Sequence, residues 1–175
     1  MIKTLTIFCL LLLGGCVSSQ DRYRHLTVKN VDLDRFMGKW YVIASIPTMF
    51  EKDACNAVEY YEKKDDGSIH VLFTYHKKTP SGELKKMTQT AYIIDQETKA
   101  YWKVRPLWPL LFDYLVIGLD SKDYQYTIIG RPNKENVWIM ARSATIPDSL
   151  YEKLLNEAVQ SGYERHKIIK VLQKW

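Results

Sequence analysis

Short runs of alternating apolar and polar residues fill most of the chain from Lys39 onward. Alternation with a period of two is typical of strands that bury one face, and turn residues such as Asp65-Asp66-Gly67 separate the runs. The pattern predicts eight strands joined by hairpins. The expected strands are 39–46, 55–63, 68–76, 84–94, 99–105, 113–120, 124–130 and 137–143.

The periodicity changes after Arg142. Between Pro147 and Gly162 apolar residues recur at helical spacing, and residues 168–172 form a last β-rich segment. We therefore expect an all-β fold, an eight-stranded antiparallel up-and-down β-barrel with one C-terminal α-helix packed outside it and a short final strand. An immunoglobulin-like sandwich is the alternative, but it offers no place for a late helix, and its usual paired cysteines are missing.

Residues 1–15 are expected to be a signal peptide. Lys3 precedes an apolar run at 5–13, which is too short to cross about 30 Å of hydrocarbon, so a transmembrane helix is not predicted. The run ends in Leu-Gly-Gly-Cys, which is similar to a bacterial lipobox, where the leader is cut before a cysteine that carries acyl chains. We expect lipidation of Cys16 and a lipidated tether over 16–27. An ordinary leader with an incidental cysteine is the alternative.

The residue after Cys16 sets the expected location. Val17 stands where some lipoproteins of double-membraned bacteria have an aspartate, and this resemblance favours transfer to the inner leaflet of the outer membrane. Several acyl chains would make the attachment effectively permanent. We therefore expect a chain that is lipid-anchored at the cell outer membrane and faces the periplasm.

Composition favours one domain over 28–175. The chain is 46% hydrophobic, no Gly/Ser-rich linker divides it, and its net charge of +5 comes from basic residues interleaved with acidic ones. This mild excess is less than nucleic-acid binders usually show, so no nucleic-acid partner is expected. The four histidines lack metal-ligand spacing, and we expect no metal or other cofactor.

Cys55 is the remaining thiol once Cys9 leaves with the leader and Cys16 is alkylated. A lone thiol in an oxidising compartment is buried and inert, links two chains into a homodimer, or is reactive. A buried structural cysteine is the most common case. No nucleophile with a base and no carboxylate pair is apparent, so the chain is not expected to be an enzyme; a thiol-dependent enzyme using Cys55 is the least favoured alternative.

Three motifs, in order, resemble those of the lipocalin family. Gly38-Lys39-Trp40 opens the first strand, Leu119-Asp120 lies at a late turn before two tyrosines, and Arg142 ends the last barrel strand. The resemblance covers residues 28–175 and, with the Cys16 motif, is greatest to bacterial outer-membrane lipocalins, with apolipoprotein D as an animal relative. It implies a barrel closed at one end that holds a small apolar ligand.

The same resemblance gives several residues structural roles. Arg142 is expected to lie over the ring of Trp40 and to close the barrel, a contact that contributes about 0.5–2 kcal/mol. Gly38 is expected to allow a tight turn where a Cβ would collide. In apolipoprotein D a cysteine at the position equivalent to Cys55 bonds a cysteine in the C-terminal tail. This tail has none, so we expect it to be unstapled.

An inward Trp40 sets the expected lining of the barrel, because side chains alternate along each strand. Ala44, Ile46 and Gly118 are expected to point inward, and the small Ala44 and Gly118 would leave space for a ligand. A barrel filled by its own side chains is the alternative. The expected ligand contacts are Val42, Ala44, Phe50, Val58, Tyr60, Val71, Phe73, Tyr75, Trp102, Val104, Tyr114, Val116, Trp138 and Met140.

Two unusually apolar loops, 47–50 and 106–112, are expected at the open end of the barrel, where they either fold inward as a lid or contact acyl chains or a membrane. Lys77, Lys78 and Arg105 lie near this end and are candidates for an anionic headgroup, with an idle basic turn as the alternative. We expect a membrane-anchored protein that binds a fatty acid or lysophospholipid-like amphiphile for storage, transport or repair of envelope lipids. A structural envelope lipoprotein with a filled barrel is the main alternative.

Overall fold

The computed structural model describes residues 21–175, so the expected signal peptide, Cys16 and the first residues of the tether lie outside the described part of the chain. The elements are, in chain order, η1 (Arg24–Leu26), α1 (Leu33–Phe36), β1 (Gly38–Ile46), β2 (Ala54–Lys63), β3 (Ile69–Lys77), β4 (Leu84–Ile93), β5 (Tyr101–Arg105), β6 (Phe112–Leu119), β7 (Tyr126–Gly130), β8 (Val137–Ala141), α2 (Asp148–Gln160), η2 (Arg165–Lys167) and β9 (Ile169–Lys170).

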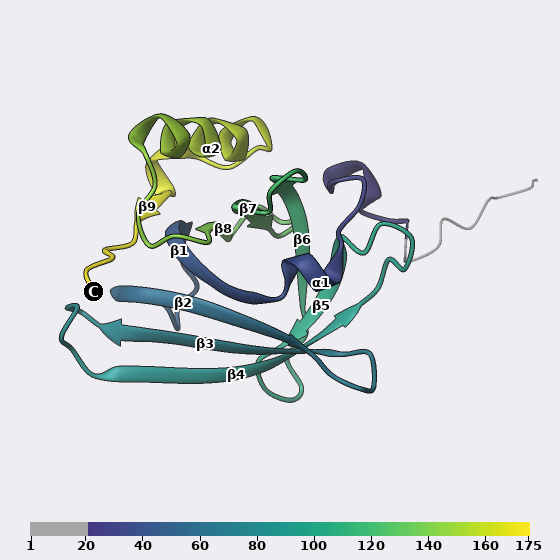
Figure 1. Ribbon diagram of the computed structural model, residues 1–175, viewed down its shortest axis with the longest axis horizontal. Helices are drawn as coiled ribbons and strands as arrows, with labels where there is room; N and C mark the ends of the chain where they lie inside the picture. The colour runs from purple at the N-terminus through teal and green to yellow at the C-terminus, as the bar shows by residue number, and fades with distance from the viewer. Residues whose placement is uncertain (1–20) are drawn as a thin grey trace, which may run out of the picture.

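Strands β1 to β8 form a closed antiparallel barrel (Figure 1). Each strand from β2 to β7 pairs with the next along the chain, and β1 closes the ring by pairing with both β8 and β2. The predicted up-and-down barrel is confirmed, and the observed strand ends lie within about two residues of those that the alternation predicted. Closure leaves the eight strands with few unpaired edges.

The final strand β9 occupies an edge of β1. Strand β2 pairs with β1 over Gly38–Tyr41, whereas Ala44 and Ser45 pair with Lys170 and Ile169 of β9. The tail thus pairs with the part of β1 that does not pair with β2. The expected final strand is confirmed, in a shorter form.

Helix α2 packs against the outside of the barrel, as predicted, and Figure 1 shows it lying beside β7, β8 and β1. Its apolar face buries Tyr151, Leu154, Leu155 and Ala158. These side chains join an outer cluster, distinct from the barrel interior, to which β1, β7 and β8 contribute. The helix is held by this amphipathic stripe rather than by a side-chain cap.

Bulges move three residues away from their predicted orientation. The register of β1 against β8 shifts between Val42 and Ala44, and Ala44 and Ile46 consequently lie in the outer cluster under α2. A similar shift in β6 follows Val116, and a Cβ on Gly118 would contact the outward Ile128. The inward orientation predicted for Ala44, Ile46 and Gly118 is wrong, because a bulge places two successive residues opposite one and so shifts the alternation.

Strand β2 faces the other way from the prediction. Glu59 pairs directly with Trp40, and residues directly opposite in an antiparallel ladder share a face, so Glu59 and Tyr61 point inward. Tyr60 is 46% exposed, and Val58 pairs with the outward Tyr41. The inward orientation predicted for Val58 and Tyr60 is wrong, because the interior position is taken by a carboxyl group that breaks the apolar alternation.

The closed end of the barrel is built around Trp40 and Arg142. The Arg142 guanidinium lies 3.7 Å from the centroid of the Trp40 ring, as predicted. It also donates hydrogen bonds to the carbonyls of Arg35, Phe36, Lys39 and Tyr124. The indole of Trp40 donates to the Phe36 carbonyl at 2.8 Å. One guanidinium therefore joins α1, β1 and the β6–β7 turn.

Gly38 is required for its backbone conformation. Its φ of +91° lies in the region that favours glycine. A Cβ there would meet Arg142 Nη1 at 3.6 Å, an ordinary contact. The expected collision is therefore wrong, and the tight turn itself accounts for the glycine.

Both ends of the described chain are tied to the barrel. Arg24 forms a bidentate ion pair with Asp95 in the β4–β5 turn of the closed end, and both N···O distances are 2.9 Å. At the other terminus, Asn56 exchanges hydrogen bonds with Lys174, and Gln173 donates to the carbonyls of Val42 and Ala57. The tail was expected to lack a disulfide that fixes it to the barrel. Hydrogen bonds of the Asn56 and Gln173 side-chain amides hold it there instead.

Candidate ligand pocket

A pocket opens into the barrel from the end opposite Trp40 and Arg142. The space among its lining atoms is about 670 Å³, a figure that counts open solvent at the mouth, so the pocket is only partly enclosed. We call it the barrel pocket. Its lining residues are Thr48, Phe50, Glu51, Glu59, Tyr61, Val71, Met87, Gln89, Val104, Pro106, Phe112, Asp113, Tyr114, Arg131 and Trp138.

Apolar side chains make up the middle of the pocket. Val71 on β3, Met87 on β4 and Val104 on β5 reach it because neighbouring strands bring inward residues to one level. Phe112 and Trp138 continue this surface toward the mouth. A concave apolar surface with a few convergent polar groups is the usual form of a small-ligand site.

The floor of the pocket is a hydrogen-bonded chain of three polar side chains, Glu59, Tyr61 and Tyr114. The Tyr61 hydroxyl donates to Oε2 of Glu59, and the two tyrosine oxygens are 2.6 Å apart. Since the Tyr61 proton is used on Glu59, Tyr114 is the donor to Tyr61. The three groups come from β2 and β6, on opposite sides of the barrel.

Burial controls the ionisation of this floor. Glu59 is 6% exposed, and loss of hydration raises its pKa to about 7, while the hydrogen bond from Tyr61 opposes this shift and nearby Glu51 adds to it. The pKa values of Tyr61 and Tyr114 are also raised by burial. Below about neutral pH the floor therefore consists of uncharged polar groups.

The mouth carries the charged and aromatic groups. Glu51 accepts hydrogen bonds from the indole of Trp138 at 3.1 Å and from the backbone of Thr48 at 3.0 Å, and its burial raises its pKa. Asp113 is paired with Lys103 at 2.8 Å. The negative side chains at the mouth are thus already engaged with the protein.

Arg131 is the basic residue of the barrel pocket. Its Nη1 donates to Asn136 at 2.9 Å, and the guanidinium lies 4.6 Å from the centroid of the Phe112 ring. Its Nε is buried and has no hydrogen-bond partner within residues 21–175. A buried donor without a partner costs about 1–3 kcal/mol, which a bound acceptor would recover. Arg131 was not predicted, although its place directly after β7 put it in a mouth loop.

Most of the residues predicted from the sequence do face the interior. Five of them line the barrel pocket, namely Phe50, Val71, Val104, Tyr114 and Trp138. Val42 and Phe73 instead border a second hollow beside the C-terminal tail. The remaining interior ones, which pack in the core without lining the barrel pocket, are Tyr75, Trp102, Val116 and Met140. Contact of any of them with a ligand stays a prediction.

The three predicted headgroup residues lie outside the barrel pocket. Lys77 and Lys78 are exposed, and Lys78 borders the hollow beside the tail. The Arg105 guanidinium lies 5.1 Å from the centroid of the Tyr92 ring on the barrel's outer side. Sequence reasoning missed Glu59 and Arg131, and it also missed Glu51, Tyr61, Met87 and Gln89. An acid within an apolar strand was the available signal for Glu59.

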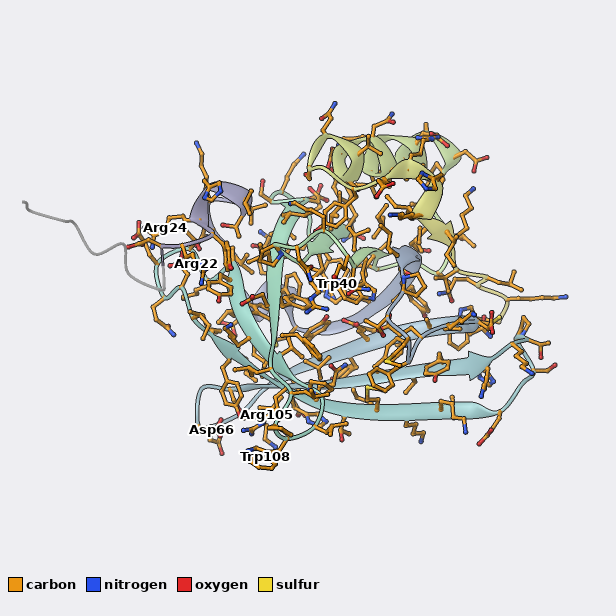
Figure 2. The ribbon with its side chains drawn as sticks, turned by 180° about the vertical axis from the view of Figure 1, so that it is seen from behind. Arg22, Arg24, Trp40, Asp66, Arg105 and Trp108 are labelled. Atoms are coloured by element: carbon orange, nitrogen blue, oxygen red, sulfur yellow. The ribbon has the colours of Figure 1, made fainter. Side chains whose placement is uncertain are left out.

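The two ends of the predicted apolar loop 106–112, Pro106 and Phe112, line the barrel pocket, whereas its middle lies open to solvent at the mouth end. Trp108 is 80% exposed and Leu107 is exposed as well. Figure 2 shows Trp108 beside Arg105, well away from Arg22 and Arg24 of the N-terminal segment. Trp108 therefore does not fold inward as a lid, whereas Phe50 of the other predicted loop does line the pocket.

Cys55 is buried at the start of β2, 7% exposed, and has no disulfide partner among residues 21–175. It borders the hollow beside the tail rather than the barrel pocket. Burial favours the inert structural role over a reactive one. An interchain bond through Cys55 stays a prediction, and it would require the tail to move.

Two further observations concern the described residues. Within 21–175, no three of the His, Cys, Asp and Glu side chains are placed to hold a metal ion. In the same range, no helix has the length and apolar character needed to cross a membrane.

A closed end, an open mouth and an apolar pocket between them define a barrel of the small-ligand-binding class. The lipocalin-like domain family matches residues 31–173 of this chain. The chain therefore belongs to the lipocalin family, as its three motifs predicted.

Similar proteins agree with this assignment. The outer membrane lipoprotein Blc of Vibrio cholerae is 29% identical over 168 residues, covering 96% of each chain. Apolipoprotein D of Macaca fascicularis is 28% identical over 162 residues, covering 89% of this chain and 81% of its own. Among solved structures, lobster apocrustacyanin A1 superposes with a TM-score of 0.63 at 15% identity, over 81% of this chain and 79% of its own, which supports the fold alone.

Proposed function

We propose that this protein is a lipid-anchored lipocalin of the bacterial outer membrane, facing the periplasm, that holds a fatty acid or lysophospholipid-like amphiphile in the barrel pocket. Storage, transport or repair of envelope lipids would use such a protein. The observation that carries the proposal is an apolar pocket with an unpaired buried donor on Arg131 near its mouth. An acyl chain fits the apolar walls, and an anionic headgroup fits Arg131.

The anchor rests on the leader and on relatives. Cys16 follows Leu-Gly-Gly after a short apolar run, and Blc proteins of Vibrio cholerae and Escherichia coli carry the name outer membrane lipoprotein. We propose cleavage after residue 15 and acylation of Cys16. Metabolic labelling with palmitate tests this directly. The full chain should incorporate label and fractionate with outer membranes, and Cys16→Ala should do neither; labelling that survives in Cys16→Ala would contradict the anchor.

Co-purifying lipid separates a binding protein from a structural one. A chain that begins at residue 21, and so lacks both the leader and the proposed anchor, is purified without detergent and extracted with organic solvent, and the extract is examined by mass spectrometry. The proposal predicts fatty acid or lysophospholipid in the extract, in amounts comparable to the protein. An empty extract, together with no uptake of added fatty acid, would favour a barrel with a purely structural role.

The thiol-dependent enzyme is not supported by the geometry. Cys55 is buried beside the tail and does not border the barrel pocket. The residues that line this hollow include no histidine, and His76, which pairs with Cys55 across β2 and β3, has its Nδ1 hydrogen-bonded to the Gly82 carbonyl at 2.8 Å. We therefore propose a binding function and no enzymatic one.

A further inference from the structure

The barrel pocket has polar groups in two positions, on the floor between β2 and β6 and at Arg131, which directly follows Gly130, the partner of Leu115 on β6. At the floor, Tyr61 and Tyr114 lie above the aromatic plug of the closed end, where Trp102 and Tyr114 stack with ring centroids 5.1 Å apart. Nearer the mouth, Arg131 presents a buried Nε without a partner in the described chain. A ligand with one polar end would satisfy only one of these places.

The hydrogen-bond directions at the floor define what it can bind. Tyr61 donates to Oε2 of Glu59, so a proton on the Glu59 carboxyl resides on Oε1, for which residues 21–175 supply no hydrogen-bond partner. Tyr114 donates to Tyr61, which leaves the Tyr114 oxygen free to accept. The floor thus offers one donor and one acceptor. A hydroxyl group, which donates once and accepts twice, is complementary to this pair.

Charged ligand ends fit the floor poorly. Glu59 is a buried part of the floor, so a carboxylate placed there would meet an acidic side chain in surroundings of low polarity. A terminal methyl group would cover Glu59 and Tyr114 without replacing their contact with water, which has a cost for buried polar groups. The anionic end of an amphiphile is better placed beside Arg131.

We propose that the barrel pocket prefers amphiphiles with polar groups at both ends, with a carboxylate beside Arg131 and a hydroxyl on the floor formed by Glu59, Tyr61 and Tyr114. The ligand class is that of fatty acids hydroxylated at or near the end of the chain. This inference rests on the proposed lipid-binding function and deepens it. It makes the floor a specificity determinant and leaves the apolar walls to set the chain length.

The test compares saturated fatty acids of graded chain length with their terminally hydroxylated counterparts. Dissociation constants are measured by calorimetry at pH 6, where Glu59 with its pKa of about 7 is largely protonated. At the length that reaches the floor, the hydroxyl should tighten binding roughly two- to tenfold, the range of one net hydrogen bond. At shorter lengths the two series should bind alike.

Variants assign the gain to the floor. Glu59→Leu and Tyr114→Phe should abolish the advantage of the hydroxylated acids, whereas Glu59→Gln, which still accepts from Tyr61 and donates, should retain it. Tyr126→Phe is the matched control, because it removes a tyrosine hydroxyl that accepts from Lys153 Nζ at 2.8 Å on the outer side of the barrel, away from the barrel pocket. It should retain the full advantage. Arg131→Met should weaken both series by the same factor.

The outcomes are distinguishable. Binding of plain fatty acids with no hydroxyl advantage at any length would overturn this inference and leave the proposed function intact. An advantage that persists in both Glu59→Leu and Tyr114→Phe would place the hydroxyl elsewhere and also overturn it. Failure of both series to bind would refute the proposed function itself. Melting temperatures of all variants verify that they are folded.

Discussion

At the scale of single residues, two groups depend on their partners, Arg142, which is partly buried at the closed end, and Glu59, which is buried in the barrel pocket. Arg142 has four carbonyl acceptors and the face of Trp40, and Glu59 has the hydroxyl of Tyr61. The first is a structural device that the family motif predicted. The second lies in the barrel pocket and was hidden by the assumption that interior positions are apolar.

Replacing Arg142 should affect stability more than ligand binding. Arg142→Ala removes the cation–π contact and leaves several carbonyls without a donor, so the free energy of unfolding should fall by about 2–4 kcal/mol. Arg142→Lys keeps the charge but loses the planar guanidinium group with its several donors, so it should recover only part of the lost free energy of unfolding. Urea titrations and fatty acid affinities measure both effects. A normal melting temperature with lost binding would contradict the structural role, and the same holds for Trp40→Ala.

Glu59 should make the protein less stable as pH rises. Its pKa is about 7 in the folded chain and near 4.5 when unfolded, so between these values the unfolded state releases a proton that the folded state keeps. The contribution of Glu59 to stability is therefore greatest below about pH 4.5 and is lost as pH rises through about 7, by up to about 3 kcal/mol. Urea titrations at pH 5 and pH 8 should show this loss in the wild type relative to Glu59→Gln. Parallel pH profiles would contradict the shifted pKa.

At the scale of elements, periodicity predicted the eight strands and the outer helix. Each of these elements buries one face, so apolar residues recur along it at the spacing of a strand or a helix. It did not predict the bulges after Val42 and Val116. A bulge depends on how a strand pairs with its neighbour, and the order of apolar and polar residues within one strand does not determine that pairing. The orientation of β2 was missed for a related reason, since the register that pairs Glu59 with Trp40 comes from the closed ring.

The docking of α2 depends on a glycine in β7. A Cβ on Gly130 would lie 2.2 Å from the hydroxyl of Tyr163, which follows α2 and exchanges hydrogen bonds with the backbone of Arg131. Gly130→Ala should therefore destabilise the fold by roughly 1–3 kcal/mol. Tyr163→Phe removes the colliding oxygen, so the double variant should lose less than the sum of the two single variants. Strict additivity in urea titrations would contradict this contact.

At the scale of the whole molecule, the N-terminal segment and the mouth lie at opposite ends of the barrel. Arg24 is held by Asp95 in the β4–β5 turn of the closed end, and the exposed Trp108 lies in the β5–β6 loop of the mouth. Figure 2 shows Arg24 and Trp108 far apart. Asp21 is five residues after Cys16, a stretch that spans at most about 18 Å when extended. With the proposed anchor at Cys16, the closed end would lie nearer the anchoring membrane and the mouth would point away.

Energy transfer to an acceptor in the bilayer tests this orientation. A fluorophore on Asp123→Cys, in the β6–β7 turn of the closed end, should transfer more strongly than one on Asn133→Cys, in the β7–β8 turn of the mouth. The buried Cys55 of the unsubstituted chain serves as the labelling control. Stronger transfer from Asn133→Cys would contradict the orientation and would indicate that the apolar mouth loops enter the same membrane.

The most direct test of the account is whether a fatty acid binds inside the barrel pocket. Gln89→Trp would fill the pocket from β4, and Thr88→Trp, on the exposed face of the same strand, is its matched control. Calorimetric titration should show saturable binding of one fatty acid per chain in the wild type and in Thr88→Trp, and loss of binding in Gln89→Trp. Undiminished binding in a folded Gln89→Trp, or no saturable binding in the wild type, would contradict the account.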